Sequence, residues 1–192
     1  MYNSGMDQKG KNSLEKEIGA YRRLRCQVDD RIGRLETIHG GHLVCRAGCC
    51  DCCVNLTVFA VELYAIASQL AESGTKKMRF DPRASCGWLE NGFCRIYAVR
   101  PIICRTHGLP VTIPQENGSE GKEVSFCPLN FTRINPETYS FGPDNTLDLA
   151  DLNERLCRIN AKFLEAFQQQ GFELPVRLEM ARLSELIGYM RA

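Results

Sequence analysis

Five cysteines fall within nine consecutive residues, Cys-Arg-Ala-Gly-Cys-Cys-Asp-Cys-Cys, which run from Cys45 to Cys53. Successive side chains leave the backbone in different directions, so this many thiols in one stretch cannot all pack into a core. They are also poor disulfide partners, because neighbours in sequence rarely meet the Cα separation and dihedral angle that a disulfide requires. Thiolate is the preferred ligand of zinc, copper(I) and iron–sulfur centres. The stretch therefore predicts a metal site around which the rest of the chain is organised.

The chain of 192 residues contains eleven cysteines, an odd number, and most of them are clustered. Disulfide frameworks are typical of secreted proteins, but the first residues are polar and lack the apolar core of a secretory signal. No apolar run approaches the ~18 residues of a membrane span. We therefore expect a soluble, cytoplasmic protein that binds metal through thiols and has no membrane partner. The 24 basic and 23 acidic residues leave a net charge of +1, so we expect no nucleic-acid partner.

Apolar residues recur at alternating spacings of four and three near the N-terminus and predict an amphipathic helix over residues 13–39, with Ser13 as its N-cap. The apolar positions of this seam are Leu14, Ile18, Tyr21, Val28, Ile32 and Leu35, and Arg25 takes the one remaining seam position. Two interpretations are open. The helix packs on the protein's own core, which we favour, or its heptad-like seam binds a protein partner or a second copy of the chain.

Further elements are indicated by caps, turns and apolar spacing. Thr57 is the expected cap of a second helix that carries Glu62 and ends at Gly74. Asn91-Gly92 predicts a β-hairpin. The remaining predicted elements are a short helix with Cys104, two extended segments at 109–113 and 123–126, and helices at 147–170 and after Pro175.

These elements predict a mainly α fold. We expect a single domain in which N- and C-terminal helices surround an irregular, cysteine-rich middle that contains a short β-hairpin. The expected segments are a flexible N-terminus at 1–12, the amphipathic helix at 13–39, a cysteine-cluster metal-binding region at 40–130 and a C-terminal helical region at 131–192.

Three groups of residues define the candidate metal site: the first cysteine block, Cys86 with the following segment Cys94-Arg-Ile-Tyr-x-x-Arg-Pro-x-x-Cys104-Arg, and Cys127-Pro. This combination closely resembles the YkgJ-type cysteine-cluster family, a zinc- or iron-chelating domain, over roughly residues 45–128. The family also shows a glutamate in the helix after the first block, here Glu62. The chain departs from the family at Cys50, where glycine is usual. Spacing and resemblance together give the expected metal ligands as Cys45, Cys49, Cys52, Cys53, Cys86, Cys94, Cys104 and Cys127.

Eight thiolates can fill two four-thiolate centres, or one centre with a reserve, and the metal is zinc or iron, with an iron–sulfur cluster as one form of the latter. Such centres are negatively charged, and four nearby arginines can offset that charge; they are Arg46, Arg95, Arg100 and Arg105. We expect His39, His42 and His107 to be exposed or to support the ligands, although His107 is also a ligand candidate. Cys26 and Cys157 have apolar neighbours on helices, so we expect them to be buried thiols outside the site.

Three functions compete. The first is a non-enzymatic metal-binding protein, in which the metal is structural or is handled as cargo; we favour it because no nucleophile–base pair and no phosphate loop is evident. The second is an iron–sulfur redox or enzymatic protein. Cys45-x3-Cys49-x2-Cys52 has the spacing of the radical S-adenosylmethionine motif, and the cysteine-cluster family is similar to part of a flagellin lysine methylase. The third is a protein–protein interaction module in which the metal acts as a staple.

Overall fold

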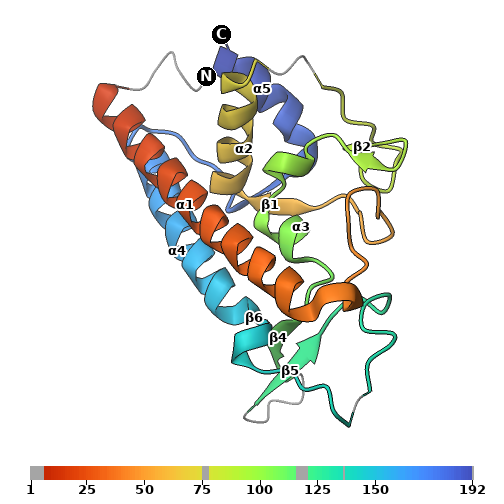
Figure 1. Ribbon diagram of the computed structural model, residues 1–192. Helices are drawn as coiled ribbons and strands as arrows, with labels where there is room; N and C mark the ends of the chain where they lie inside the picture. Colours follow the sequence, from red (N-terminus) through yellow and green to blue (C-terminus); the bar gives the residue numbers. More distant parts are fainter. Residues whose placement is uncertain (1–6, 75–77, 116–120, 136, 192) are drawn as a thin grey trace. The chain divides into compact units, whose positions relative to one another are not determined.

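The computed structural model describes residues 7–74, 78–115, 121–135 and 137–191, and it confirms a mainly α protein (Figure 1). The helices are α1 (Gln8–His39), α2 (Ala60–Glu72), α3 (Ile102–Thr106), α4 (Leu149–Gln168) and α5 (Leu183–Arg191). The strands are short: β1 (Thr57–Phe59), β2 (Leu89–Glu90), β3 (Phe93–Cys94), β4 (Val111–Pro114), β5 (Lys122–Ser125), β6 (Leu147–Asp148) and β7 (Arg177–Glu179). Single 3-10 turns lie at Gly40–His42, Tyr97–Val99, Pro143–Asn145 and Met180–Arg182.

The chain forms two compact units, and each unit is assembled from segments that are distant in sequence. Unit 1 comprises the described residues of Met1–Leu24, Ala47–Pro101 and Leu156–Ala192, and unit 2 comprises those of Arg25–Arg46 and Ile102–Arg155. Helices α1 and α4 each contribute one part to unit 1 and one part to unit 2. The boundary also divides the first cysteine block, because Cys45 belongs to unit 2 and Cys49 to unit 1.

Unit 1 is built on the packing of α2 against α5, which lie side by side in Figure 1. The segment before α2 forms β1, which pairs antiparallel with β7, so that Val58 lies opposite Leu178. The indole of Trp88 is 1% exposed, and its Nε1–H donates to the carbonyl of Met180 at 3.2 Å. Fully burying each large apolar side chain contributes about 1.5–3 kcal/mol. The apolar core of this unit therefore includes residues on both sides of the cysteine-rich segment.

Unit 2 contains a three-stranded sheet in the order β5-β4-β6 (Figure 1). Strand β4 pairs antiparallel with β5 and parallel with β6. Leu35 of α1 packs with Leu109 and Leu147, which lie beside β4 and on β6. The two extended segments expected at 109–113 and 123–126 are thereby confirmed as β4 and β5.

The N-terminal helix begins earlier than the sequence predicts. It starts at Gln8, because the carboxylate of Asp7 accepts the backbone N–H of Gly10 at 2.7 Å and caps the first turn. Ser13 is therefore inside the helix, and residues 8–12 of the expected flexible segment 1–12 are helical; residues 1–6 lie outside the described residues. The apolar seam is buried: Leu14, Tyr21 and Leu35 are each 0% exposed. The interpretation that the seam packs on the protein's own core is confirmed.

Helix α2 does not use the predicted Thr57 cap, since Thr57 lies in β1. The helix begins at Ala60, and the carboxylate of Glu62 accepts the backbone N–H of Phe59 at 3.2 Å. Glu62 is 2% exposed and also accepts the hydroxyl of Tyr21 at 3.3 Å. The structure therefore gives Glu62 a role at the start of a helix, where its negative charge is favoured by the helix dipole.

The Asn91-Gly92 hairpin is confirmed, with Leu89 opposite Cys94 and both turn residues at positive φ. The last helix differs from the prediction: residues 177–179 form β7, and α5 begins only at Leu183. Among the described residues, no helix is both long enough and apolar enough to cross a bilayer.

Candidate metal centre

In unit 1, the loop that carries most of the first cysteine block lies against the β2–β3 hairpin. A tight turn closes the loop, because the backbone N–H of Cys53 donates to the carbonyl of Cys50 at 2.9 Å. Gly48 has a φ of +95°, and a Cβ at this position would lie 3.2 Å from the ring of Phe93. Glycine here allows the left-handed conformation and the close approach to the hairpin. The loop is thereby placed beside β3, which ends in Cys94.

A second connection fixes the segment that carries Cys86. The side-chain amide of Asn55 accepts the backbone N–H of Gly87 at 2.9 Å and donates to the carbonyl of Ala84 at 3.2 Å. Asn55 thus ties the chain just after Cys53 to the turn around Cys86. Sequence reasoning missed this residue, because a single asparagine in a loop carries no pattern that links it to a distant turn.

Five thiols of unit 1 are close enough to perturb one another. Burial, and after it the negative charges that Cys52, Cys86, Cys94 and Cys50 would carry as thiolates, together raise the pKa of Cys53 to about 11. The pKa of Cys94 is also raised, first by burial and then by Cys86. Ionisation of Cys53 and of Cys94 is therefore disfavoured, and a positive charge beside them, such as that of a metal ion, would favour it.

One arginine partly offsets this effect. Arg100 opposes the rise in the pKa of Cys94, as does a hydrogen bond from the backbone N–H of Ile96. The guanidinium of Arg100 lies 3.7 Å from the ring centroid of Tyr97, and its Nε donates to the carbonyl of Tyr97 at 3.2 Å. Arg100 is therefore held beside the thiol group, as expected. Arg95, by contrast, lies 3.7 Å from the carboxylate of Glu90.

In unit 2, Cys45 and Cys127 meet at Gly108. A Cβ at position 108 would lie 2.8 Å from the sulfur of Cys45 and 3.3 Å from the Cβ of Cys127. The backbone N–H of Cys127 donates to the carbonyl of Gly108 at 3.2 Å, and this bond joins the segment of Cys127 to the turn at Gly108. Cys104 belongs to the same unit and lies on α3, which ends just before Gly108. Arg105, expected beside a thiolate, forms an ion pair with Asp29 at 2.7 Å.

The buried amide of Asn130 is the second residue that the sequence analysis missed. Its Nδ2 lies 3.4 Å from the sulfur of Cys45, and the side chain is only 1% exposed. Asn130 lies three residues after Cys127, the last predicted ligand. Its backbone N–H donates to the carbonyl of Cys127 at 2.9 Å and closes a short turn between them.

The histidines do not all lie where the sequence predicts. His39 is 1% exposed, and its ring nitrogens lie 2.5 Å from the hydroxyl of Tyr139 and 2.7 Å from the carbonyl of Asn145. It is a core histidine among aromatic side chains, so the expectation of an exposed or ligand-supporting residue is wrong. His42 stacks on Phe131 with a centroid separation of 6.2 Å. His107 is exposed.

All eleven cysteines lie in the described residues, and none forms a disulfide. Cys26 and Cys157 are exposed rather than buried, because they point away from the apolar faces of α1 and α4. Within residues 7–74, 78–115, 121–135 and 137–191, no three His, Cys, Asp or Glu side chains are already gathered closely enough to hold a metal ion. The donor set nonetheless fits a soft metal, since thiolates predominate and several are partly exposed.

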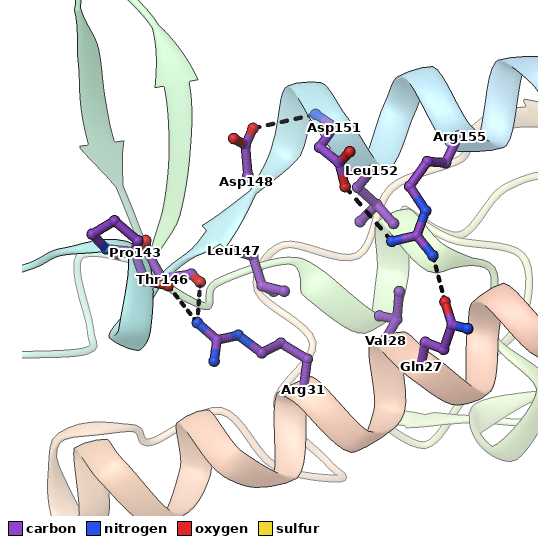
Figure 2. A pocket seen from close by; sticks show the side chains of 10 residues that line it. All are labelled: Gln27, Val28, Arg31, Pro143, Thr146, Leu147, Asp148, Asp151, Leu152 and Arg155. Carbon is purple, nitrogen blue, oxygen red and sulfur yellow. Dashed lines mark hydrogen bonds and ion pairs between the residues drawn. The ribbon is translucent and has the colours of Figure 1, made fainter.

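A pocket in unit 2 is distinct from these thiols. It has a volume of about 250 Å³ and lies between α1, β6 and α4, as Figure 2 shows. Arg31 donates to the carbonyls of Pro143 and Thr146 at 2.6 and 2.9 Å, and Arg155 bridges Gln27 and Asp151. None of the ten residues that line this pocket is a cysteine, so the pocket is no part of the candidate metal centre.

Comparison with known families supports the metal-binding interpretation. Residues 44–128 match the family model CxxCxxCC, described as "Putative zinc- or iron-chelating domain". This match confirms the resemblance to the cysteine-cluster family over that segment, and it supports metal binding in general. No curated protein and no solved structure matches the chain.

Proposed function

We propose that the chain, which carries a cysteine-cluster domain at residues 44–128, binds zinc or iron in two separate thiolate groups, one in each unit. The group of unit 1 consists of Cys49, Cys52, Cys53, Cys86 and Cys94, and that of unit 2 consists of Cys45, Cys104 and Cys127. The observation that carries this proposal is that Cys52, Cys86 and Cys94 all lie close enough to Cys53 to raise its pKa; Cys49 is included on the spacing of the cysteine block.

The unit 1 group offers more thiols than one tetrahedral ion needs. A centre of four thiolates around a dication carries about two negative charges. Arg100, held beside Cys94 by its stacking on Tyr97, offsets part of that charge and supports the choice of Cys94 as a ligand. Cys52 and Cys53 are adjacent and rarely both bind one ion, so one of them binds while the other, or Cys50, remains as a reserve.

The unit 2 group offers three thiols. Three protein ligands leave a fourth position for water, for the exposed His107 or for an incoming ligand. The approach of the Cys45 sulfur and of Cys127 to Gly108 supports this group, since the backbone of Cys127 is hydrogen-bonded to Gly108.

The role that we propose is metal handling rather than a purely structural staple. Each of the eight candidate thiols is partly or fully exposed, so an ion can enter and leave without disrupting the core. Unit 1 has an apolar core of its own, with Trp88, Leu63 and Phe163 fully buried, which a metal is not needed to hold together. Reduced thiols also require a reducing compartment, which favours the cytoplasm.

The small sheets of the described residues weigh against the radical-enzyme alternative. They have two or three strands each, whereas radical S-adenosylmethionine enzymes use a barrel of repeated strands and helices. An iron–sulfur form of the same thiolate groups remains part of the proposal, and a brown colour with acid-labile sulfide after anaerobic purification would identify it.

The test is the metal content of reconstituted full-length protein, measured per chain by elemental analysis. A variant with six serines, at Cys49, Cys50, Cys52, Cys53, Cys86 and Cys94, removes the unit 1 group together with its reserve thiol, and Cys45→Ser/Cys127→Ser removes unit 2 ligands. Each is expected to lose one of two bound metal centres and to keep the other. Cys157→Ser and Cys26→Ser are matched controls, one in each unit, because both thiols are exposed and lie outside the groups. Loss of all metal in either variant would point to one shared centre, and full retention in both would overturn the proposal.

A further inference from the structure

Asn130 is the most deeply buried polar residue near a candidate ligand, at 1% exposed, and it lies beyond the segment 44–128 that matches the metal-chelating family. Burial of an amide is unfavourable unless its hydrogen bonds are satisfied. The hydrogen bonds of this side chain therefore show which groups the buried amide holds in place.

The amide joins three segments of unit 2. Its Oδ1 accepts the backbone N–H of Val44 at 2.8 Å, and its Nδ2 donates to the carbonyl of Gly108 at 2.6 Å. A backbone N–H can only donate and a carbonyl can only accept, so these two partners fix which amide atom is oxygen and which is nitrogen. The same Nδ2 lies 3.4 Å from the sulfur of Cys45, close enough to donate to it.

The backbone of Asn130 makes the fourth connection, from its N–H to the carbonyl of Cys127 at 2.9 Å. One residue thus contacts the sulfur of Cys45, the peptide before it, the turn that follows α3 and the segment of Cys127. Removal of its side chain frees the Cys45 sulfur from its donor and loosens the Val44–Gly108 connection at the same time.

We propose that Asn130 is a positioning residue for the thiol group of unit 2: it holds Cys45 beside Cys127 and donates an N–H to the Cys45 sulfur. This inference rests on the proposed function of that group. Hydrogen bonds from neighbouring groups orient metal ligands, and losing one typically lowers metal affinity 10–100-fold.

The chain contains a matched control in Asn160. This residue is 2% exposed and also bridges two backbone segments, since it accepts the N–H of Val61 at 3.0 Å and donates to the carbonyl of Val176 at 3.1 Å. It belongs to unit 1, whereas Asn130 contacts Cys45 in unit 2. Asn160→Ala therefore deletes a buried bridging amide, with the destabilisation that this causes, but it removes no hydrogen bond to a thiol.

The experiment uses the full chain with six thiols of unit 1 replaced by serine (Cys49, Cys50, Cys52, Cys53, Cys86 and Cys94), so that the unit 2 group is the one titrated. Co²⁺ is the spectroscopic probe. Asn130→Ala removes the whole bridge, and Asn130→Asp keeps the shape and the acceptor to Val44 but loses the donor. Both are expected to weaken Co²⁺ binding at least tenfold and to reduce the sulfur-to-cobalt charge-transfer absorption. In chelator-treated protein, both should also speed alkylation of Cys45, followed by mass spectrometry. Asn160→Ala should leave all three readouts within about twofold of the parent.

The outcomes separate the two proposals. If Cys45→Ser/Cys127→Ser in the same background does not abolish Co²⁺ binding, the proposed metal group of unit 2 fails. If that variant abolishes binding but Asn130→Asp, folded by circular dichroism, keeps the parent affinity and spectrum, the positioning role fails. An equal loss of affinity in Asn160→Ala would also overturn it, because the effect would then be one of general destabilisation.

Discussion

Gly108 is the position where a single added methyl group tests the geometry of the unit 2 thiols most directly. In Gly108→Ala, the new Cβ would stand 2.8 Å from the sulfur of Cys45 and 3.3 Å from the Cβ of Cys127. Real Cβ atoms do not approach other atoms as closely as the first of these distances, so the sulfur must rotate away or the turn must shift. Either movement separates Cys45 from Cys127.

The loss of unfolding free energy in Gly108→Ala has two parts. Gly108 has a φ of +87°, and an alanine held in a left-handed conformation costs about 1–2 kcal/mol. Relieving the overlap with Cys45 adds about 1–3 kcal/mol, the usual range for overpacking. The total loss of unfolding free energy is therefore about 2–5 kcal/mol, together with a weakened metal group.

Gly40→Ala separates the effect of the backbone conformation from the effect of the steric overlap. Gly40 belongs to the same unit and has a φ of +51°, but a Cβ there meets nothing within 4 Å. It should lose only the conformational part, about 1–2 kcal/mol, and should bind metal as the parent does.

The assay combines urea unfolding, followed by the fluorescence of the single tryptophan, with metal content per chain. We expect Gly108→Ala to lose the metal of unit 2 while Gly40→Ala keeps it. Equal metal content in the two variants would refute the placement of Cys45 against Gly108, as would equal losses of stability.

Three further predictions follow from buried or perturbed groups. Glu62→Ala should lower the unfolding free energy by about 2 kcal/mol in urea titrations, because the N–H of Phe59 loses its acceptor; an unchanged midpoint would contradict the helix-start role. Trp88→Phe should cost about 1 kcal/mol or more, since the carbonyl of Met180 loses its donor, and a neutral result would contradict the burial of the indole. In metal-free protein, stability should fall as the pH rises from about 9 to about 11. The folded state holds the Cys53 proton more tightly than the unfolded state, so this contribution is complete below the unfolded pKa and is lost above it. Cys53→Ser should flatten that slope in thermal melts across the same range.

Local signals in the sequence predicted the local structure well. The Asn91-Gly92 turn and the apolar seam of α1 depend on neighbours a few residues apart, and both are present. The start of α1 was misplaced because Asp7 competes with Ser13 as a cap, and a cap is decided by which carboxylate or hydroxyl meets the first N–H groups.

Long-range features could not be predicted in the same way. The pairing of β1 with β7 depends on two short segments that meet across most of the chain. Asn130 has no periodicity or motif that separates it from any loop asparagine, although it contacts Cys45. The family pattern predicted eight cysteine ligands, which remain a prediction, and it contained no sign that Cys45 and Cys49 belong to different units.

The pairing of Thr57 with Glu179 has a consequence for protein synthesis. Residues 45–94 leave the ribosome long before residues 177–179, so unit 1 cannot close its β1–β7 ladder until nearly all of this chain has been translated. Until then, the thiols of unit 1 have no completed unit to hold them. Metal that reaches the nascent chain therefore meets a flexible row of thiols, and the cell must keep them reduced for most of the time that synthesis takes.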